Sequence, residues 1–167
     1  NGFQPVDTKI VSIGAGAFGS QVVNNLWRGG FGSWTIIDDD ALEPHNLARH
    51  LLNADAVGFN KAYAVATTMA SLYPESRATQ SIGVNYLSPG VEDAKVTQAL
   101  GQAEVVMDFS ASVPVARQLA NDTRTRVRRI SAFLNQRGDE SVILAEDAER
   151  RVDLGWLEAE YMRAICE

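Results

Sequence analysis

A glycine-rich turn stands between a short apolar run and an amphipathic helix near the start of the chain. Residues 9–13 form a β-branched run that ends in Gly14-Ala15-Gly16-Ala17-Phe18-Gly19, and apolar residues then recur at helical spacing until a glycine pair. Such a unit binds phosphate at the turn and at the helix N-terminus, where free N–H groups and a partial positive charge favour anions. The pattern predicts a Rossmann-type nucleotide site at Gly14, Gly16 and Gly19. A turn that only packs a sheet is the alternative.

Three consecutive acids end the second apolar run, residues 34–37. Asp38 follows the turn by about twenty residues, the spacing at which an acid hydrogen-bonds the ribose hydroxyls of a nucleotide. Asp39 and Asp40 continue the acidic run, and three carboxylates at one strand end repel one another. We therefore expect cations, hydrogen-bond donors or a metal to face some of them.

The polar residues beyond this strand decide between classes of nucleotide. Asn46, Arg49 and Lys61 supply one neutral donor and two cations, and a guanidinium and an ammonium are suited to phosphate oxygens. Either cation alone would be an ordinary surface residue, so the inference depends on the set. An NAD-dependent oxidoreductase would also use the turn and Asp38, but NAD binding would not explain why Asp40 and the two cations occur together. The set favours ATP.

The order of these motifs resembles the ThiF/MoeB/HesA superfamily, whose members are adenylation domains of the ubiquitin-activating type. The resemblance covers nearly the whole chain and includes the bacterial branch associated with JAB-type isopeptidase or ubiquitin-conjugating-like domains. It is carried by the glycine turn, Asp38-x-Asp40, Asn46-Leu47-x-Arg49, Gly58-x-x-Lys61-Ala62, the Tyr73-Pro74 helix end and Val105-Val106-Met107-Asp108.

The resemblance implies a reaction and roles for particular residues. The C-terminal glycine carboxylate of a ubiquitin-like or sulfur-carrier protein would attack the α-phosphate of ATP, giving an acyl-adenylate and pyrophosphate. Asp38 would hold the ribose, Asp40 would help with Mg²⁺, and Asn46, Arg49 and Lys61 would contact the triphosphate. We expect Arg49, Lys61 and Asp108 as catalytic residues, Asp40 and Asp108 as metal ligands, and a homodimer.

One departure from the family pattern concerns a catalytic acid. The family usually continues its strand into an Asp-Cys-Thr-Asp-Asn type motif, whereas this chain reads Asp108-Phe109-Ser110-Ala111-Ser112. Ala111 stands where the second acid is expected. We expect Asp40 or Asp108 to carry the metal with help from the two serines. The alternatives are weakened adenylation and a module that binds ATP or serves as a scaffold without catalysis.

Composition agrees with one globular domain, which we expect to span residues 1–167 and to be a fragment of a longer protein. The chain of 167 residues is 46% hydrophobic and carries a net charge of −6, which argues against a nucleic-acid partner. An arginine-rich run at 124–129 is expected to be solvated or paired. The sequence contains no stretch of about eighteen apolar residues, so we expect no membrane span. The lone Cys166 allows neither an internal disulfide nor a zinc cluster, and we expect a cytoplasmic protein.

The remaining periodicity completes the expected α/β fold, a Rossmann-like and mostly parallel sheet with helices on both faces. Strands are expected at 78–86 and 104–108, and helices at 89–101 and 113–126. A glycine-bearing turn separates residues 128–135 from 141–146, which suggests antiparallel strands added toward the C-terminus. A helical stripe follows from Leu154 to Ile165. His45 and His50 have no partners at metal-ligand spacing, so a hydrogen-bonding or surface role is expected for both.

Overall fold

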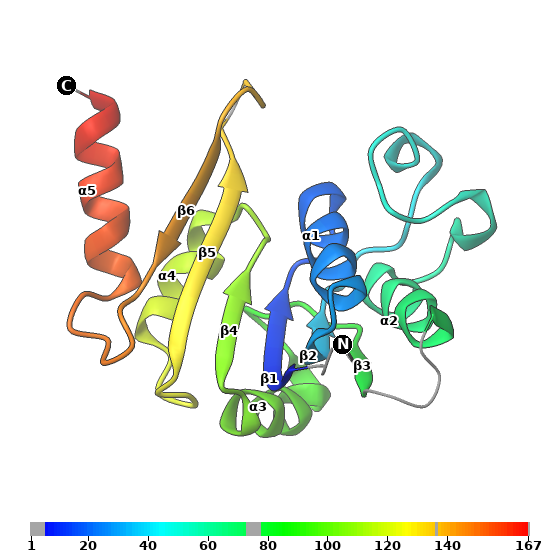
Figure 1. Cartoon of the computed structure of the whole chain (residues 1–167), viewed down its shortest axis with the longest axis horizontal. Helices are drawn as coiled ribbons and strands as arrows, with labels where there is room; N and C mark the ends of the chain where they lie inside the picture. The colour runs from blue at the N-terminus through cyan, green and yellow to red at the C-terminus, as the bar shows by residue number, and fades with distance from the viewer. Residues whose placement is uncertain (1–5, 73–77, 136, 167) are drawn as a thin grey trace, which may run out of the picture.

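A computed structural model describes residues 6–72, 78–135 and 137–166 as a six-stranded sheet flanked by helices (Figure 1). The strand order is β3-β2-β1-β4-β5-β6. The strands are β1 (Val6–Ile13), β2 (Phe31–Ile37), β3 (Thr79–Ile82), β4 (Val105–Asp108), β5 (Arg128–Leu134) and β6 (Ser141–Ala145). The α-helices are α1 (Ala17–Arg28), α2 (Lys61–Leu72), α3 (Asp93–Gln102), α4 (Val113–Asn121) and α5 (Leu154–Cys166). Short 3₁₀ turns lie at Pro44–Asn46, Ala54–Ala56 and Gly90–Glu92.

The predicted fold class is confirmed. Strands β1 to β5 pair in parallel, and β6 pairs antiparallel with β5. The glycine-bearing turn thus joins a hairpin, as expected, although its first strand also continues the parallel sheet. The chain runs from β1 outward to β3 and then returns to the other side of β1. That reversal places a switch point between β1 and β4, where ligands of open α/β sheets bind beyond the carboxyl ends of the strands.

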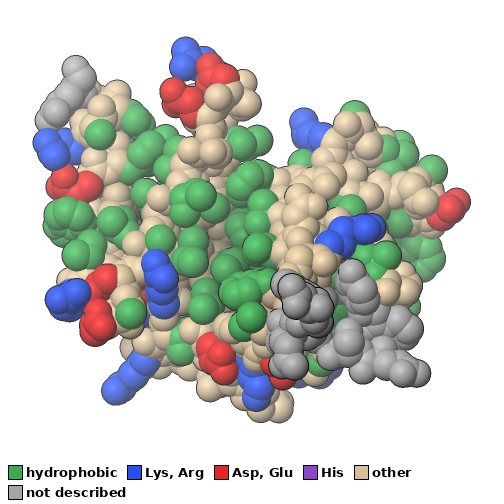
Figure 2. Space-filling model, in the orientation of Figure 1, with side chains coloured by type: hydrophobic (Ala, Val, Ile, Leu, Met, Phe, Trp, Pro, Cys, Tyr) green, Lys and Arg blue, Asp and Glu red, His purple; other side chains and the backbone are tan. Residues whose placement is uncertain are grey.

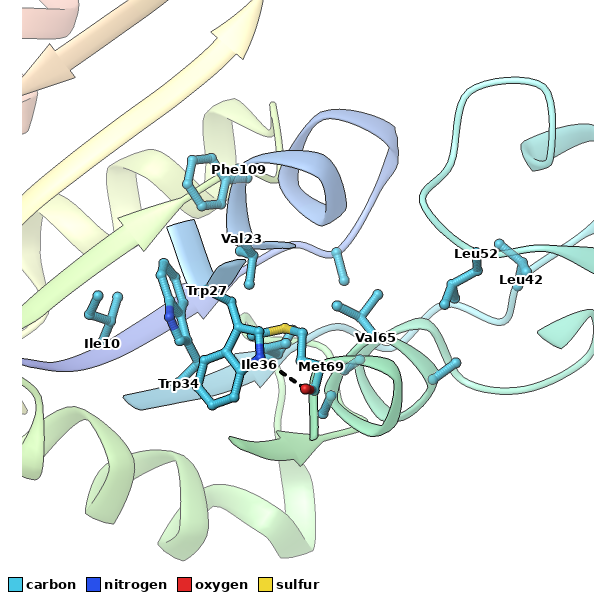
Figure 3. Packing of buried hydrophobic residues seen from close by; sticks show 14 of the residues in the cluster. Ile10, Val23, Trp27, Trp34, Ile36, Leu42, Leu52, Val65, Met69 and Phe109 are labelled. Carbon is cyan, nitrogen blue, oxygen red and sulfur yellow. Dashed lines mark hydrogen bonds between the residues drawn. The ribbon is translucent and has the colours of Figure 1, made fainter. Parts of the chain in front are cut away.

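Alternating strand residues build one core on each face of the sheet. Ile10 points toward α1 and α2, whereas its neighbour Val11 packs with α3 and α4 on the opposite face. On the first face, Trp27 of α1 is fully buried and its indole Nε1 donates to the Met69 carbonyl of α2 at 2.9 Å (Figure 3). This bond joins the helix after the glycine turn to the helix that begins at Lys61.

The face that carries α1 is open over β4, β5 and β6. Figure 2 shows hydrophobic side chains gathered there, in the orientation of Figure 1. Leu134 of β5 and Ile143 of β6 are 46% and 66% exposed. Among the described helices, none is long and apolar enough to span a membrane.

Helix α3 begins at Asp93 rather than at residue 89, after a 3₁₀ turn, and two other elements end several residues earlier than the periodicity predicts. Strand β3 ends at Ile82 rather than at residue 86. Helix α4 ends at Asn121 rather than at 126, because the Asp122 carboxylate accepts the Arg124 N–H at 2.9 Å and forms a local turn. The buried Arg129 guanidinium then donates to three backbone carbonyls around that turn, so Arg124 and Arg129 of the basic run are paired within the chain. The Tyr73-Pro74 helix end lies outside the described residues.

Candidate nucleotide-binding site

The glycine turn follows β1 at the switch point and abuts the loop after β4. Gly14 has φ +93°, and a Cβ placed on it would lie 2.7 Å from the Ser110 nitrogen. A Cβ on Gly19 would lie 2.8 Å from Cβ of Phe109. Glycine at position 14 therefore permits the turn, and glycine at position 19 permits close packing against the loop after β4. A Cβ on Gly16 would have nothing within 4 Å, so the backbone there faces open space that a ligand can enter.

Asp38 ties the end of β2 to the glycine turn. Its Oδ2 accepts the Ala15 N–H at 2.6 Å, and its Oδ1 accepts the Asp40 N–H at 2.9 Å. Burial raises the pKa of the Asp38 carboxyl, and these two backbone donors oppose that rise. Each oxygen keeps a second acceptor site, so the carboxylate can hold the turn and still accept a hydroxyl.

The other two acids also have donors facing them, as the sequence analysis expects for a strand end with three carboxylates. Asn85 donates its side-chain amide to Asp39 Oδ2 at 3.0 Å. The Lys61 ammonium lies 2.8 Å from Asp40 Oδ2, with its side chain only 10% exposed against 68% for Asp40. Lys61 is therefore more buried than the carboxylate that it pairs with. Such burial is unusual for a lysine, and the ion pair keeps the lysine charge at this strand end.

Asn60 positions this lysine and was not singled out in the sequence. Its Oδ1 accepts the Tyr63 N–H at 3.0 Å at the start of α2. Its Nδ2 donates to the Asp38 carbonyl at 2.8 Å. One side chain thus caps the lysine helix and holds the acidic strand end. The signal was present, because an asparagine directly before a helical stripe is a typical N-cap.

His50 also contacts the glycine turn, through the backbone carbonyl of Ala15. The ring is buried, its Nδ1 accepts the Leu52 N–H at 3.1 Å, and its Nε2 lies 2.7 Å from the Ala15 carbonyl. Because Nδ1 accepts, Nε2 is the nitrogen that donates to Ala15. Burial lowers the pKa of His50, which agrees with a neutral ring. The expected hydrogen-bonding role of His50 is confirmed, while His45 is exposed beside Glu43.

Asn46 and Arg49 lie on the segment between β2 and α2 rather than on a strand end. Asn46 Oδ1 accepts the Glu43 N–H at 3.0 Å, and Glu43 in turn caps the 3₁₀ turn, so the amide oxygen is used locally. Arg49 is exposed, and within the described part of the chain its guanidinium has no hydrogen bond or ion pair to another side chain. The structure brings Asp38, Asp40 and Lys61 together and leaves these two residues outside that group.

Asp108 ends β4 as a buried carboxylate that accepts hydrogen bonds from two serines. Its Oδ1 accepts both the N–H and the hydroxyl of Ser110, at 2.9 and 2.6 Å, and its Oδ2 accepts the Ser131 hydroxyl at 3.0 Å. Burial raises its pKa, and the serine hydrogen bonds lower it. Ala111, two residues after Phe109, has φ +54°, a region that aspartate and asparagine tolerate better than alanine does.

A cleft of about 260 Å³ lies at the glycine turn and the ends of β2 and β4, and Lys61 and Asp108 are not part of its lining. Asp38, Asp39 and Asp40 line one side of it and Ser110 and Ser112 the other. Each of the three acids can present one oxygen within 4.8 Å of the other two, and carboxylate oxygens are the ligands that Mg²⁺ takes. The acidic triplet therefore fits a divalent cation. Asp108 does not belong to this group among the described residues.

The structure is a Rossmann-like domain with an acidic strand end and a paired lysine. The sequence profile of the ThiF family matches residues 6–127. The chain therefore belongs to the ThiF family.

Relatives of the chain include a ubiquitin transferase-like protein and an activating enzyme. It is 37% identical over 112 residues to the ATP-dependent ubiquitin transferase-like protein Cap2 of Enterobacter hormaechei, which covers 67% of this chain and 18% of the relative. It is 30% identical over 118 residues to the SAMP-activating enzyme E1 of Haloferax volcanii, covering 70% and 41% of the two chains. The crystal structure of E. coli MccB with ATP matches the fold with a TM-score of 0.62 at 22% identity, covering 76% of this chain and 37% of MccB. The chain thus spans less than half the length of each.

Proposed function

We propose that this domain binds ATP with Mg²⁺ and adenylates the C-terminal glycine carboxylate of a ubiquitin-like or sulfur-carrier protein, releasing pyrophosphate. One observation carries the proposal. The acid on β2, the glycine turn and the Lys61–Asp40 pair are joined by hydrogen bonds into one wall at the switch point. A hydride-transfer site does not require a buried lysine against an acidic triplet, whereas the triphosphate of ATP does require a nearby cation and metal ligands.

Each residue has a defined task in this reaction. Asp38 accepts the ribose hydroxyls while it fixes the turn, and the open backbone at Gly16 lets the phosphates approach the N-terminus of α1. Lys61 supplies positive charge to phosphate oxygens that become more negative as pyrophosphate leaves. Arg49, exposed and unpaired among the described residues, is the second cation once the segment before α2 closes on the triphosphate.

The metal ligands differ in part from those expected by resemblance. Asp40 lies in the acidic triplet, so it stays a proposed ligand, together with its neighbour Asp39, while Asp38 is proposed to hold the ribose. Asp108 lies outside the triplet, and we propose that its hydrogen bonds to Ser110 and Ser131 fix the Ser110 loop over the glycine turn. Mg²⁺ would offset phosphate charge and polarise the α-phosphate. Dimerisation stays a prediction.

The experiment is ATP binding followed by pyrophosphate exchange. We expect ATP with Mg²⁺ to raise the melting temperature, with no response to NAD, and labelled pyrophosphate to exchange into ATP when the cognate partner is present. Lys61→Ala should abolish exchange, while Lys95→Ala, an exposed lysine paired with Glu92, serves as the matched control. Stabilisation by NAD instead of ATP would refute the proposal.

Ala111 favours a second candidate, an ATP-binding scaffold without adenylation. The acid expected at this position is replaced in a loop that contacts the glycine turn. ATP binding without any pyrophosphate exchange in the presence of the correct partner would decide for the scaffold. Gain of exchange in Ala111→Asp would show that this position alone had silenced the reaction.

A further inference from the structure

An open groove of about 440 Å³ lies at the opposite end of the sheet from the nucleotide cleft. Its lining comes from the end of α4, the turn before β5 and the loop between β6 and α5, and it includes Arg126, Arg129 and Arg150. Figure 1 shows this turn and this loop at the end of the sheet away from the arrowheads of β1 and β4. The nucleotide cleft lies at those arrowheads, so the proposed ATP site does not account for the three arginines.

Arg129 is the buried arginine of this groove, with only 1% of the residue exposed. Its Nη1 donates to the Ala120 carbonyl at 2.6 Å, and its Nη2 donates to the carbonyls of Asp122 and Thr125. These carbonyls lie at and after the end of α4, where the helix dipole favours a cation. They carry only partial charges, and in the described part of the chain no carboxylate forms an ion pair with Arg129.

The Nε–H of Arg129 has no hydrogen-bond acceptor among the described residues, although the atom is buried. A buried donor without an acceptor is destabilising, and a buried guanidinium is normally paired with an anion. Burial lowers the pKa of Arg129, and the nearby Arg150 charge lowers it further. The opposing charges of Glu146 and Asp122 do not outweigh these two effects. An anion in the groove would accept a hydrogen bond from Nε and supply the missing negative charge.

The charge balance around the groove leaves two positive charges uncompensated. Three nearby arginines already have carboxylate partners, at 2.6 Å for Arg124–Asp122 and Arg150–Glu146 and at 3.5 Å for Arg151–Glu149. Arg126 is exposed and, like Arg129, has no ion pair among the residues that the structure describes. The groove therefore favours a doubly charged anion.

We propose that this groove binds a phosphate group, either inorganic phosphate or the phosphoryl group of a monoester. A phosphate monoester carries about −1.5 to −2 charges near pH 7, which matches the two uncompensated guanidinium groups. One phosphate oxygen accepts the Nε–H of the buried Arg129, and the exposed Arg126 contacts the others from the rim. A carboxylate supplies about half of that charge and is the weaker ligand.

The first test is a titration with inorganic phosphate at constant ionic strength, followed through the Nε–H NMR signals of the arginines. We expect phosphate to shift the Arg129 signal downfield, because a charge-assisted hydrogen bond forms at this atom. Chloride at the same ionic strength should leave the signal unmoved, and acetate should bind more weakly than phosphate. An Arg129 signal that does not respond, or that responds equally to chloride, would overturn the proposal. Phosphate-dependent shifts confined to the glycine turn would do the same.

Two variants test the two cations separately. Arg126→Gln should weaken phosphate binding about tenfold, because one charge-assisted hydrogen bond is lost. Arg137→Gln, at an exposed arginine paired with Asp139 between β5 and β6, removes the same charge elsewhere and should keep the wild-type affinity. Phosphate should raise the melting temperature of the wild type but not that of Arg129→Met. Arg126→Gln carries the test if Arg129→Met does not fold, and wild-type phosphate affinity in either folded variant would refute the site.

Two further titrations identify the source of the phosphate group and separate this site from the proposed function. If N-acetyl-O-phosphoserine amide binds more tightly than inorganic phosphate, the ligand is a phosphorylated residue, and the reverse order assigns the groove to the free ion. ATP with Mg²⁺ should leave the response of Arg129 to phosphate unchanged, and loss of that response on saturation with ATP would overturn a separate site. A phosphate response at Arg129 without any ATP binding supports the groove and overturns the proposed function alone.

Discussion

Replacement of Asn60 by alanine should destabilise the domain and weaken ATP binding together. The variant loses the acceptor for the Tyr63 N–H, worth about 1 kcal/mol at a helix N-cap. It also loses the donor to the Asp38 carbonyl, worth about 1 kcal/mol for a hydrogen bond of this kind. We expect the free energy of unfolding in urea to fall by about 2 kcal/mol. For a domain of this size the melting temperature should fall by about 4–8 °C.

Two further variants separate the cap from the contact with the strand end. Asn60→Asp keeps the acceptor for the helix but removes the donor and adds a charge near Asp38 and Asp40, so it should remain destabilised at neutral pH. Asn53→Ala is the matched control, because Asn53 precedes a 3₁₀ turn without a side-chain cap bond, and its effect should stay within about 0.5 kcal/mol. ATP affinity measured by calorimetry should fall only in the two Asn60 variants. A wild-type unfolding free energy for Asn60→Asp would show that the strand-end contact contributes nothing.

Three more predictions concern other parts of the chain. Ala111→Gly should raise the free energy of unfolding by about 1 kcal/mol, because glycine adopts φ +54° without strain; a loss of stability in thermal unfolding would contradict this. Desolvation opposes ionisation of Asp122, but hydrogen bonds from Arg124 and Tyr86 outweigh it and lower the pKa of Asp122. Its contribution to stability is therefore full above the ordinary aspartate pKa and is lost as pH falls below about 4. Asp122→Asn should flatten this part of the pH–stability curve, and an unchanged slope would disprove the assignment. Glu146→Ala should cost about 3 kcal/mol or more, measured by urea unfolding, because the carboxylate is fully buried with donors around it; a cost below about 1 kcal/mol would show that the site relaxes.

Features that depend on local sequence pattern could be predicted from the sequence. The glycine turn, Asp38 at the end of β2 and Lys61 at the start of α2 each follow from periodicity or from spacing within one structural unit. The acidic run also predicted that hydrogen-bond donors or cations would lie beside it, because three neighbouring carboxylates repel one another. Asn85 and Lys61 are those donors.

Hydrogen bonds made by individual side chains, whether local or between distant segments, could not be predicted from such patterns. The end of α4 was placed too late because a side-chain turn at Asp122 competes with the helix. The orientation of the Asn46 side chain depends on the hydrogen bond that its Oδ1 accepts from the Glu43 N–H. The spacing of Asn46 and Arg49 in the sequence does not reveal that hydrogen bond. The dual role of Asn60 depends on the approach of β2 to α2 in space.

The division of labour between the two carboxylates follows from their surroundings. Asp40 stands at an exposed strand end beside two other acids, so a cation gains from all three and loses little by desolvation. Asp108 already accepts hydrogen bonds from two serine hydroxyls and one backbone N–H. A metal that displaced these donors would have to offset the free energy of the lost hydrogen bonds. We therefore do not expect the alanine at position 111 to shift metal binding onto Asp108, and the acidic triplet stays the proposed metal site.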